Sequence, residues 1–123
     1  VLWAKGALEK GQPLRIVSDQ FRTPTLAEDL AQGCILAAMK RAQGIYNISG
    51  KDQMSVLELV KRVAKYFDLP TDQISEVTTD TLNQRARRPL VTGFVLDKAR
   101  RDLGYEPHSF EEGIALVMSQ TAQ

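Results

Sequence analysis

The chain has 123 residues, 43% hydrophobic and 25% charged, which is the composition of a single globular domain and argues against disorder. Its 16 basic and 15 acidic side chains give a formal net charge of +1, which argues against a general electrostatic attraction to nucleic acid or to an anionic membrane surface. No apolar run approaches the roughly 20 residues of a membrane-spanning helix. The one cysteine, Cys34, can form no internal disulfide, as expected for a cytoplasmic protein.

The hydrophobic pattern alternates between helical and strand-like segments, which predicts a mixed α/β fold with about five helices and a few short strands. The first helical pattern is already in progress at Val1, which indicates that the chain is part of a longer protein. The predicted elements, in chain order, are a helix over residues 1–11, a strand over 14–18, a polar loop over 19–25, a helix over 26–41, a buried strand over 44–49, a helix that begins at 55 and is ended by Pro70, a strand over 74–78, an irregular segment over 79–95, a short helix over 97–103, and a last helix from 110 that frays from 119.

Two of these helices begin with the spacing of a capping box, in which a serine and a glutamate three residues later bond each other's backbone N–H groups. Ser55 with Glu58 begins the first, and Ser109 with Glu112 begins the last. Asp97 is predicted to cap the short helix between them.

Helical spacing also predicts which residues of the helix over 26–41 face the core: Leu30, Cys34, Ala37 and Ala38. Cys34 is therefore expected to be a packed thiol and not a nucleophile. The one histidine, His108, falls in a predicted loop and is expected to be a surface residue without a catalytic role.

Motifs for catalysis and for cofactors are missing from the sequence. The eight glycines never fall in the spacing of a dinucleotide-binding turn, and no Cys/His cluster has the spacing of a zinc site. The carboxylate pairs at 28–29 and 111–112 fall in the first turns of predicted helices, where the helix dipole explains them. We therefore predict no catalytic residue, no metal ligand and no cofactor-binding residue in this chain.

Two loops carry arginines suited to binding an anion. Arg22 lies in the loop that leads into the helix over 26–41, and helix N-termini are common anion sites. Arg85, Arg87 and Arg88 cluster in the irregular segment before Pro89. An arginine fork can hold a phosphate with two parallel hydrogen bonds. From the residue types alone, an ordinary solvated surface is the favoured interpretation of either loop, and an anion site is the alternative.

Four strings of the sequence, in this order, resemble dTDP-4-dehydrorhamnose reductases and related sugar-nucleotide epimerases of the extended short-chain dehydrogenase type. They are RIVSDQFRTPTLAEDLAQG at residues 15–33, GIYNISG at 44–50, RRPLVTGFVLDKARRDLGYEP at 87–107 and SFEEGIALV at 109–117. Together they cover nearly the whole chain, and the first contains the DQ-x-x-x-P-T loop that connects a strand to a helix in this family.

The resemblance implies that residues 1–123 form a single C-terminal sugar-nucleotide-binding domain, which an N-terminal Rossmann domain would precede. NAD(P) would then be bound by the full-length protein and not by this chain alone. The Tyr-x-x-x-Lys catalytic pair of the family is missing, because the residues four positions after the three tyrosines are Gly50, Pro70 and Ser109. The isolated chain is therefore predicted to be inactive.

The resemblance also implies a substrate site. In related epimerases, arginines at the positions of Arg22 and Arg88 hold the diphosphate, so these two residues would bind a dTDP- or UDP-linked sugar. Gln20 and Thr23 would contact the nucleotide or the sugar. Arg87 would either share the role of Arg88 or be surface charge.

Three functions remain open at this stage. A reductase is preferred, but reductases of the family usually carry a small residue at the position of Arg22, which favours the substrate domain of an epimerase or dehydratase. A non-catalytic, reductase-like regulatory or binding protein is the third, and the residues that would distinguish it are expected upstream of Val1. A nucleic-acid-binding module is disfavoured, because no aromatic residues are interleaved with the arginines.

Overall fold

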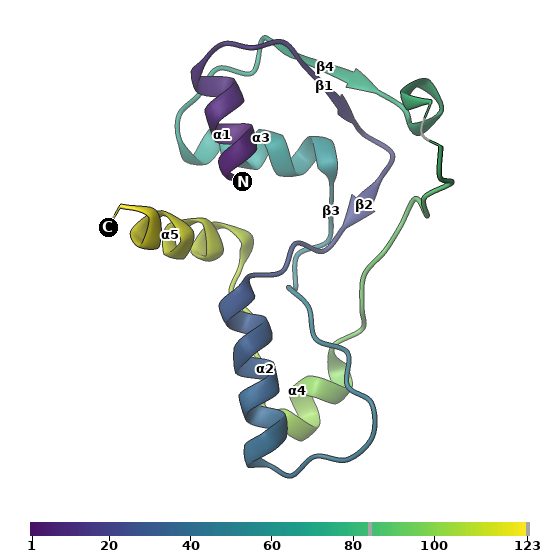
Figure 1. Cartoon of the computed structure of the whole chain (residues 1–123), viewed down its shortest axis with the longest axis vertical. Coiled ribbons are helices and arrows are strands. Elements are labelled where there is room, and N and C mark those ends of the chain that lie inside the picture. Colours follow the sequence, from purple (N-terminus) through teal and green to yellow (C-terminus); the bar gives the residue numbers. More distant parts are fainter. Residues whose placement is uncertain (84, 123) are drawn as a thin grey trace. The chain divides into compact units, whose positions relative to one another are not determined.

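The structure is a computed structural model that describes residues 1–83 and 85–122. Gln84, in the predicted irregular segment, and Gln123, at the end of the predicted tail, lie outside the described residues. The described residues form five α-helices and a few short strands, which confirms the predicted mixed α/β fold (Figure 1). No helix among them is both long enough and apolar enough to cross a membrane.

The chain divides into two compact units. Unit 1 is Val1–Arg22 with Met54–Thr92, and unit 2 is Thr23–Gln53 with Gly93–Gln123. The chain passes from one unit to the other between Arg22 and Thr23, so the DQ-x-x-x-P-T loop contributes residues to both.

Unit 1 is built on a parallel pair of strands. The strands β1 (Leu14–Val17) and β4 (Ile74–Val77) pair so that the first residue of each lies opposite the first of the other. Parallel strands need a long connection, and the helix α3 (Val56–Tyr66) forms part of it and contacts β1. The helix α1 (Leu2–Glu9) lies beside α3 (Figure 1). The two helices and β1 together bury an apolar core that includes Ala4, Leu8, Ile16, Val60, Val63 and Ala64.

The predicted elements of unit 1 are found close to their expected bounds. At the start of α3, the side chain of Ser55 accepts a hydrogen bond of 3.0 Å from the backbone N–H of Glu58, which is one half of the predicted capping box. One strand pairing and one helical turn were not predicted. The short strand β2 (Phe21–Arg22) pairs antiparallel with β3 (Met54–Ser55), and the 3-10 helix η1 (Thr79–Leu82) follows β4.

Unit 2 consists of helices α2 (Ala27–Met39), α4 (Asp97–Leu103) and α5 (Phe110–Thr121) with the loops between them. The lower part of Figure 1 shows α2 beside α4. The core of the unit is a cluster of four buried residues with partly buried neighbours, among them Leu96, Ala99, Leu103, Tyr105, Leu36 and Ile48. The hydroxyl of Tyr105 donates a 2.8 Å hydrogen bond to the backbone oxygen of Ser49, which ties the loop before Lys51 to this core.

The ends of α4 and α5 test the predicted caps. The complete capping box at Ser109 and Glu112 is confirmed. Gly104 ends α4 with a φ of +67°, a conformation that glycine adopts without strain. Asp97 is the first residue of α4 and Leu96 is at the N-cap, so the predicted cap was wrong by one position. The helix α5 continues to Thr121, beyond the expected fraying point.

The predicted strand over residues 44–49 is wrong. No described strand pairs with this segment, and Ile45 is 83% exposed. A strand needs a neighbour that accepts and donates its ladder hydrogen bonds. In this chain the ammonium of Lys98 hydrogen-bonds the backbone oxygen of Ile45 instead, at 2.8 Å.

The predicted core face of α2 is wrong at three of its four residues. Leu30, Cys34 and Ala38 are exposed, whereas Ala37 is partly buried and packs against the core as predicted. The buried residues of the helix are Asp29 and Gly33. Gly33 is buried because it lies against the side chain of Ile48, where a Cβ atom would come within 2.9 Å of Cγ2. The inward side of the helix therefore includes a carboxylate and a glycine, which hydropathy alone does not indicate.

Candidate functional site

Asp19, at the end of β1, is held against the start of η1. Its carboxylate accepts hydrogen bonds from the backbone N–H of Thr79 at 3.0 Å and from the hydroxyl of Thr79 at 2.7 Å. The Thr79 hydroxyl is the main reason that the pKa of Asp19 lies below its usual range, and the backbone N–H adds to it. Asp19 is thus a charged anchor that fixes η1 relative to β1.

Gln20 extends this network toward Arg22. It is only 5% exposed, and its amide nitrogen donates to the hydroxyl of Thr79 at 3.2 Å. Its side-chain oxygen accepts a 3.0 Å hydrogen bond from Nη2 of Arg22. Both polar atoms of Gln20 are therefore engaged within the protein, which makes it a positioning residue for Arg22 in this structure.

The guanidinium of Arg22 is held by three acceptors. Nη1 donates to the backbone oxygens of Phe21 at 2.6 Å and Leu90 at 3.2 Å, and Nη2 donates to Gln20. A guanidinium has five N–H donors. Among the described residues, Nε and one hydrogen of Nη2 have no further hydrogen-bond partner, so Arg22 keeps donors for a ligand while its orientation is fixed.

A pocket of about 540 Å³ adjoins this network within unit 1. Its lining includes three arginines, two aspartates and two neutral polar residues, namely Arg85, Arg87, Arg88, Asp19, Asp80, Thr79 and Asn83. The three arginines are exposed. Leu90, whose oxygen accepts from Arg22, also lines the pocket. The pocket and the Arg22 network therefore share residues, although Arg22 does not itself line the pocket.

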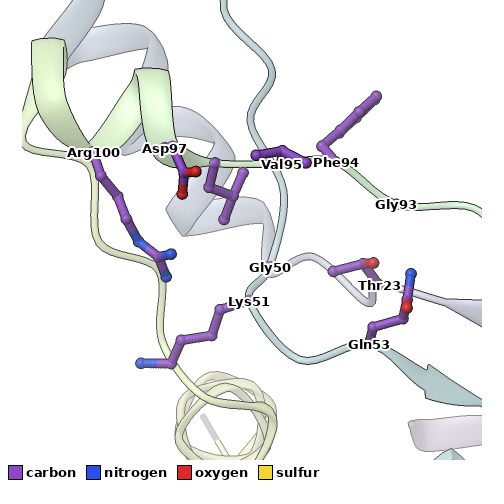
Figure 2. Close-up of a pocket in the computed structure, with 10 residues that line it drawn as sticks. Thr23, Gly50, Lys51, Gln53, Gly93, Phe94, Val95, Asp97 and Arg100 are labelled. Carbon is purple, nitrogen blue, oxygen red and sulfur yellow. The ribbon is translucent and has the colours of Figure 1, made fainter.

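Of the five predicted substrate-binding residues, four lie in this part of unit 1. Arg22 and Gln20 are bonded to each other, and Arg87 and Arg88 line the adjoining pocket. Thr23 lies in unit 2 and lines a different pocket (Figure 2). Sequence reasoning missed Thr79 and Asn83, because a short polar segment without periodicity is typical of any loop.

The chemistry of the unit 1 pocket is that of a donor-rich, cationic surface. Three arginines line it against two carboxylates, Asp19 and Asp80, and Asp19 already accepts hydrogen bonds from Thr79. The arginines extend from irregular backbone. Such a set suits an oxyanion with several acceptor atoms. No group of His, Cys, Asp and Glu among the described residues is arranged to hold a metal ion.

Fold and pocket together define a mixed α/β domain with an arginine-lined pocket. The chain matches the family described as the RmlD substrate binding domain over residues 4–123. Because this match covers nearly the whole chain, the chain belongs to that family.

Comparison with individual proteins agrees with this assignment. Spore coat polysaccharide biosynthesis protein SpsK of Bacillus subtilis (strain 168) is 29% identical over 106 residues, which are 86% of this chain and 36% of that protein. Methionine adenosyltransferase 2 subunit beta of Xenopus tropicalis is 32% identical over 73 residues, which are 55% of this chain and 22% of that protein. The chain thus spans well under half of the length of these relatives.

Solved structures confirm the fold. The dTDP-4-dehydrorhamnose reductase of Bacillus anthracis, in complex with NADP, superimposes with a TM-score of 0.85 at 21% identity, over 97% of this chain and 42% of that one. The UDP-glucuronic acid 4-epimerase of Bacillus cereus, in complex with UDP-glucuronic acid and NAD, gives 0.67 at 23% identity, over 89% of this chain and 35% of that one. The resemblance to both groups that the sequence predicted is therefore confirmed.

Proposed function

We propose that this chain is the sugar-nucleotide-binding domain of an NAD(P)-dependent reductase of the dTDP-4-dehydrorhamnose reductase type, and that it binds substrate without being catalytic alone. The observation that carries the proposal is the position of the fixed guanidinium of Arg22 beside the unit 1 pocket. Arg22 donates to the backbone oxygen of Leu90 and to Gln20, and Gln20 donates to Thr79. Both Leu90 and Thr79 line the pocket, as do Arg87 and Arg88. Two sets of arginine donors beside one pocket suit the two charged groups of a nucleoside diphosphate.

In this proposal the residues have different tasks. Arg87 and Arg88 bind the diphosphate oxygens, and Arg22 adds its remaining donors. Gln20 holds Arg22 in place from its buried position, and Asp19 holds the η1 side of the pocket through Thr79. Bound in this way, the sugar nucleotide is oriented, while proton and hydride transfer fall to residues outside this chain.

The cofactor of such an enzyme does not fit the residues present. A dinucleotide site requires a glycine-rich turn between a strand and a helix, since the backbone must approach the pyrophosphate closely. The segment that follows β1 is SDQFRTP, which contains no glycine. We therefore assign NAD(P) binding to a Rossmann domain elsewhere in a longer, cytoplasmic protein.

We further propose that such a domain covers the exposed apolar face of α2. Leu30, Ile35 and Met39 are 48%, 50% and 76% exposed, and Cys34 lies among them. A contiguous exposed apolar face on one helix marks an interaction surface. The relatives are more than twice as long as this chain. We propose that the domain that covers α2 is a Rossmann domain preceding this chain.

An epimerase or dehydratase of the same architecture would need the same diphosphate site. The similarity of fold to the Bacillus cereus epimerase supports this second candidate. A regulatory protein would also keep the site, and only the reaction of the full-length protein separates these three.

Titration of the isotope-labelled 123-residue chain with dTDP, followed by NMR, tests the proposal. We expect saturable shifts of backbone amides in residues 19–22 and 85–90. The double variant Arg87→Gln, Arg88→Gln should bind at least about tenfold more weakly, because each lost charge-assisted contact contributes more than a neutral one. Arg15→Gln is the matched control, since Arg15 is an exposed arginine of unit 1 outside the pocket lining. A titration that leaves both segments unshifted would contradict the proposal.

A further inference from the structure

Unit 2 contains a pocket of its own that the proposed function does not use. It has a volume of about 420 Å³, which lies within the range of small-molecule sites. The loop at Gly50–Gln53, the segment at Gly93–Asp97 and residue Arg100 of α4 form it, and Figure 2 shows their arrangement.

Two glycines shape the pocket wall. A Cβ atom on Gly93 would come within 2.6 Å of the hydroxyl of Thr23 and 2.9 Å of the amide nitrogen of Gln53. A Cβ atom on Gly50 would come within 2.0 Å of the backbone oxygen of Pro24. Bare backbone therefore approaches these polar groups closely, and one end of the pocket presents a hydroxyl and an amide.

The other end of the pocket is cationic. Figure 2 shows the side chains of Arg100 and Lys51 ending on the same side, away from Thr23 and Gln53. Glu106 contacts both cations: it lies 3.2 Å from Nε of Arg100 and 3.6 Å from the ammonium of Lys51. Its carboxylate also accepts from Nη2 of Arg100, and Nη1 has no hydrogen-bond partner among the described residues, so its two donors can serve a ligand.

Asp97 adds one feature that a plain anion site lacks. Its carboxylate lines the pocket near Arg100, and an ionised carboxylate only accepts hydrogen bonds. A bound molecule must therefore bring a donor to Asp97 and acceptors to Lys51 and Arg100. Thr23 and Gln53 can serve a hydroxyl either as donors or as acceptors.

We infer that the unit 2 pocket binds a small hydroxylated organic anion, with its carboxylate or phosphate on Lys51 and Arg100 and a hydroxyl group on Asp97. The ligand displaces part of the contact between Glu106 and the two cations. This site is separate from the diphosphate site proposed in unit 1, and it stands whether or not that proposal holds.

Two probes with a common carbon skeleton identify the anionic group. Gluconate and glucose-6-phosphate are titrated separately into the isotope-labelled 123-residue chain, and glucose and inorganic phosphate are the partial probes. We expect one or both hydroxylated anions to shift amides of Gly50, Lys51 and Gly93 saturably, and the tighter of the two gives the source. Glucose and phosphate should each bind at least about tenfold more weakly, since each makes only part of the contacts.

Variants on one helix provide the matched control. Arg100→Gln should weaken binding about tenfold or more, whereas Arg101→Gln, whose side chain is 72% exposed and pairs with Asp102, should leave it unchanged. Lys51→Gln provides a second variant if Arg100→Gln disturbs α4. The inference is overturned if neither hydroxylated anion shifts the pocket amides, if a partial probe binds as tightly as both, or if the two arginine variants behave alike. Shifts confined to amides of unit 1 would also overturn the inference. A dTDP titration without shifts would contradict the diphosphate site in unit 1 but not this inference.

Discussion

The buried carboxylate of Asp29 accepts two hydrogen bonds from a single residue, His108. The backbone N–H of His108 lies 2.9 Å from Oδ2, and Nδ1 of the ring lies 2.6 Å from Oδ1. Because an ionised carboxylate only accepts, Nδ1 carries the proton in this contact. The pair joins the first turn of α2 to the loop before α5, so the one histidine of the chain has a structural task.

Replacing Asp29 should therefore destabilise the fold. Asp29 is 4% exposed, and Asp29→Ala removes both acceptors, which leaves the backbone N–H of His108 without its partner. We expect the free energy of unfolding to fall by about 1–3 kcal/mol, the usual cost of an unsatisfied buried group. His108→Ala keeps the backbone bond and should cost less, about 1 kcal/mol. Urea denaturation at neutral pH measures both, and an Asp29→Ala variant as stable as wild type would contradict the assignment.

Tyr105 predicts how stability depends on alkaline pH. Burial, with a smaller contribution from the charge of Asp29, raises the pKa of Tyr105 from 10.0 to about 12. The folded protein thus favours the neutral phenol, so this contribution to stability is complete below pH 10 and is lost as the pH rises toward 12.

The variant Tyr105→Phe isolates this effect. It should lack that part of the alkaline loss, while at neutral pH it should be less stable by about 1 kcal/mol through loss of the bond to Ser49. Denaturation curves of both proteins across this pH range test the prediction. Parallel pH profiles for the two proteins would show that Tyr105 titrates as it does in the unfolded chain.

Two glycines should respond in opposite directions to alanine. Gly6 lies inside α1 with no atom within 4 Å of an added Cβ, so Gly6→Ala should stabilise the protein by about 0.5–1 kcal/mol. Gly50→Ala would place a Cβ 2.0 Å from the backbone oxygen of Pro24 and should cost about 3 kcal/mol. Thermal unfolding of the two variants gives the comparison, and equal midpoints would mean that the loop at Gly50 adapts freely.

Cys34 reports on the exposed face of α2. Because its side chain is exposed, a thiol reagent should label the folded 123-residue chain at a rate within about tenfold of that for the unfolded chain, in contrast to a packed thiol. In a longer protein in which a Rossmann domain covers α2, the same thiol should be protected. The labelling rate, followed by mass spectrometry, separates these cases. Equal labelling in the longer protein would contradict the proposed cover.

The variant Arg22→Lys tests whether the proposed diphosphate site depends on the planar geometry of the guanidinium as well as on its charge. Arg22→Lys keeps the positive charge but loses the planar fork that bonds Phe21, Leu90 and Gln20 together. We expect the affinity for dTDP to fall about tenfold, with Arg15→Lys unchanged. Isothermal titration calorimetry measures the affinities. Full retention of affinity in Arg22→Lys would place the ligand elsewhere on the chain.

Several features of this protein could be predicted from its sequence because they depend on residues close together in the chain. The capping box at Ser109 and the glycine that ends α4 depend on residues only a few positions apart, and the structure confirms both. The strands β1 and β4 lie in segments that contain Ile and Val, and the structure confirms both. The family resemblance rests on four strings in order, and the match over residues 4–123 confirms it.

Tertiary structure decided what depends on distant neighbours. The inward face of α2 is set by Ile48 against Gly33 and by His108 on Asp29, neither of which helical spacing can indicate. The segment 44–49 has strand-like composition but no pairing partner among the described residues, and a strand cannot form without one. The hydrogen bond from Gln20 to Thr79 joins residues 59 positions apart, and only folding brings such a donor and acceptor within hydrogen-bonding distance.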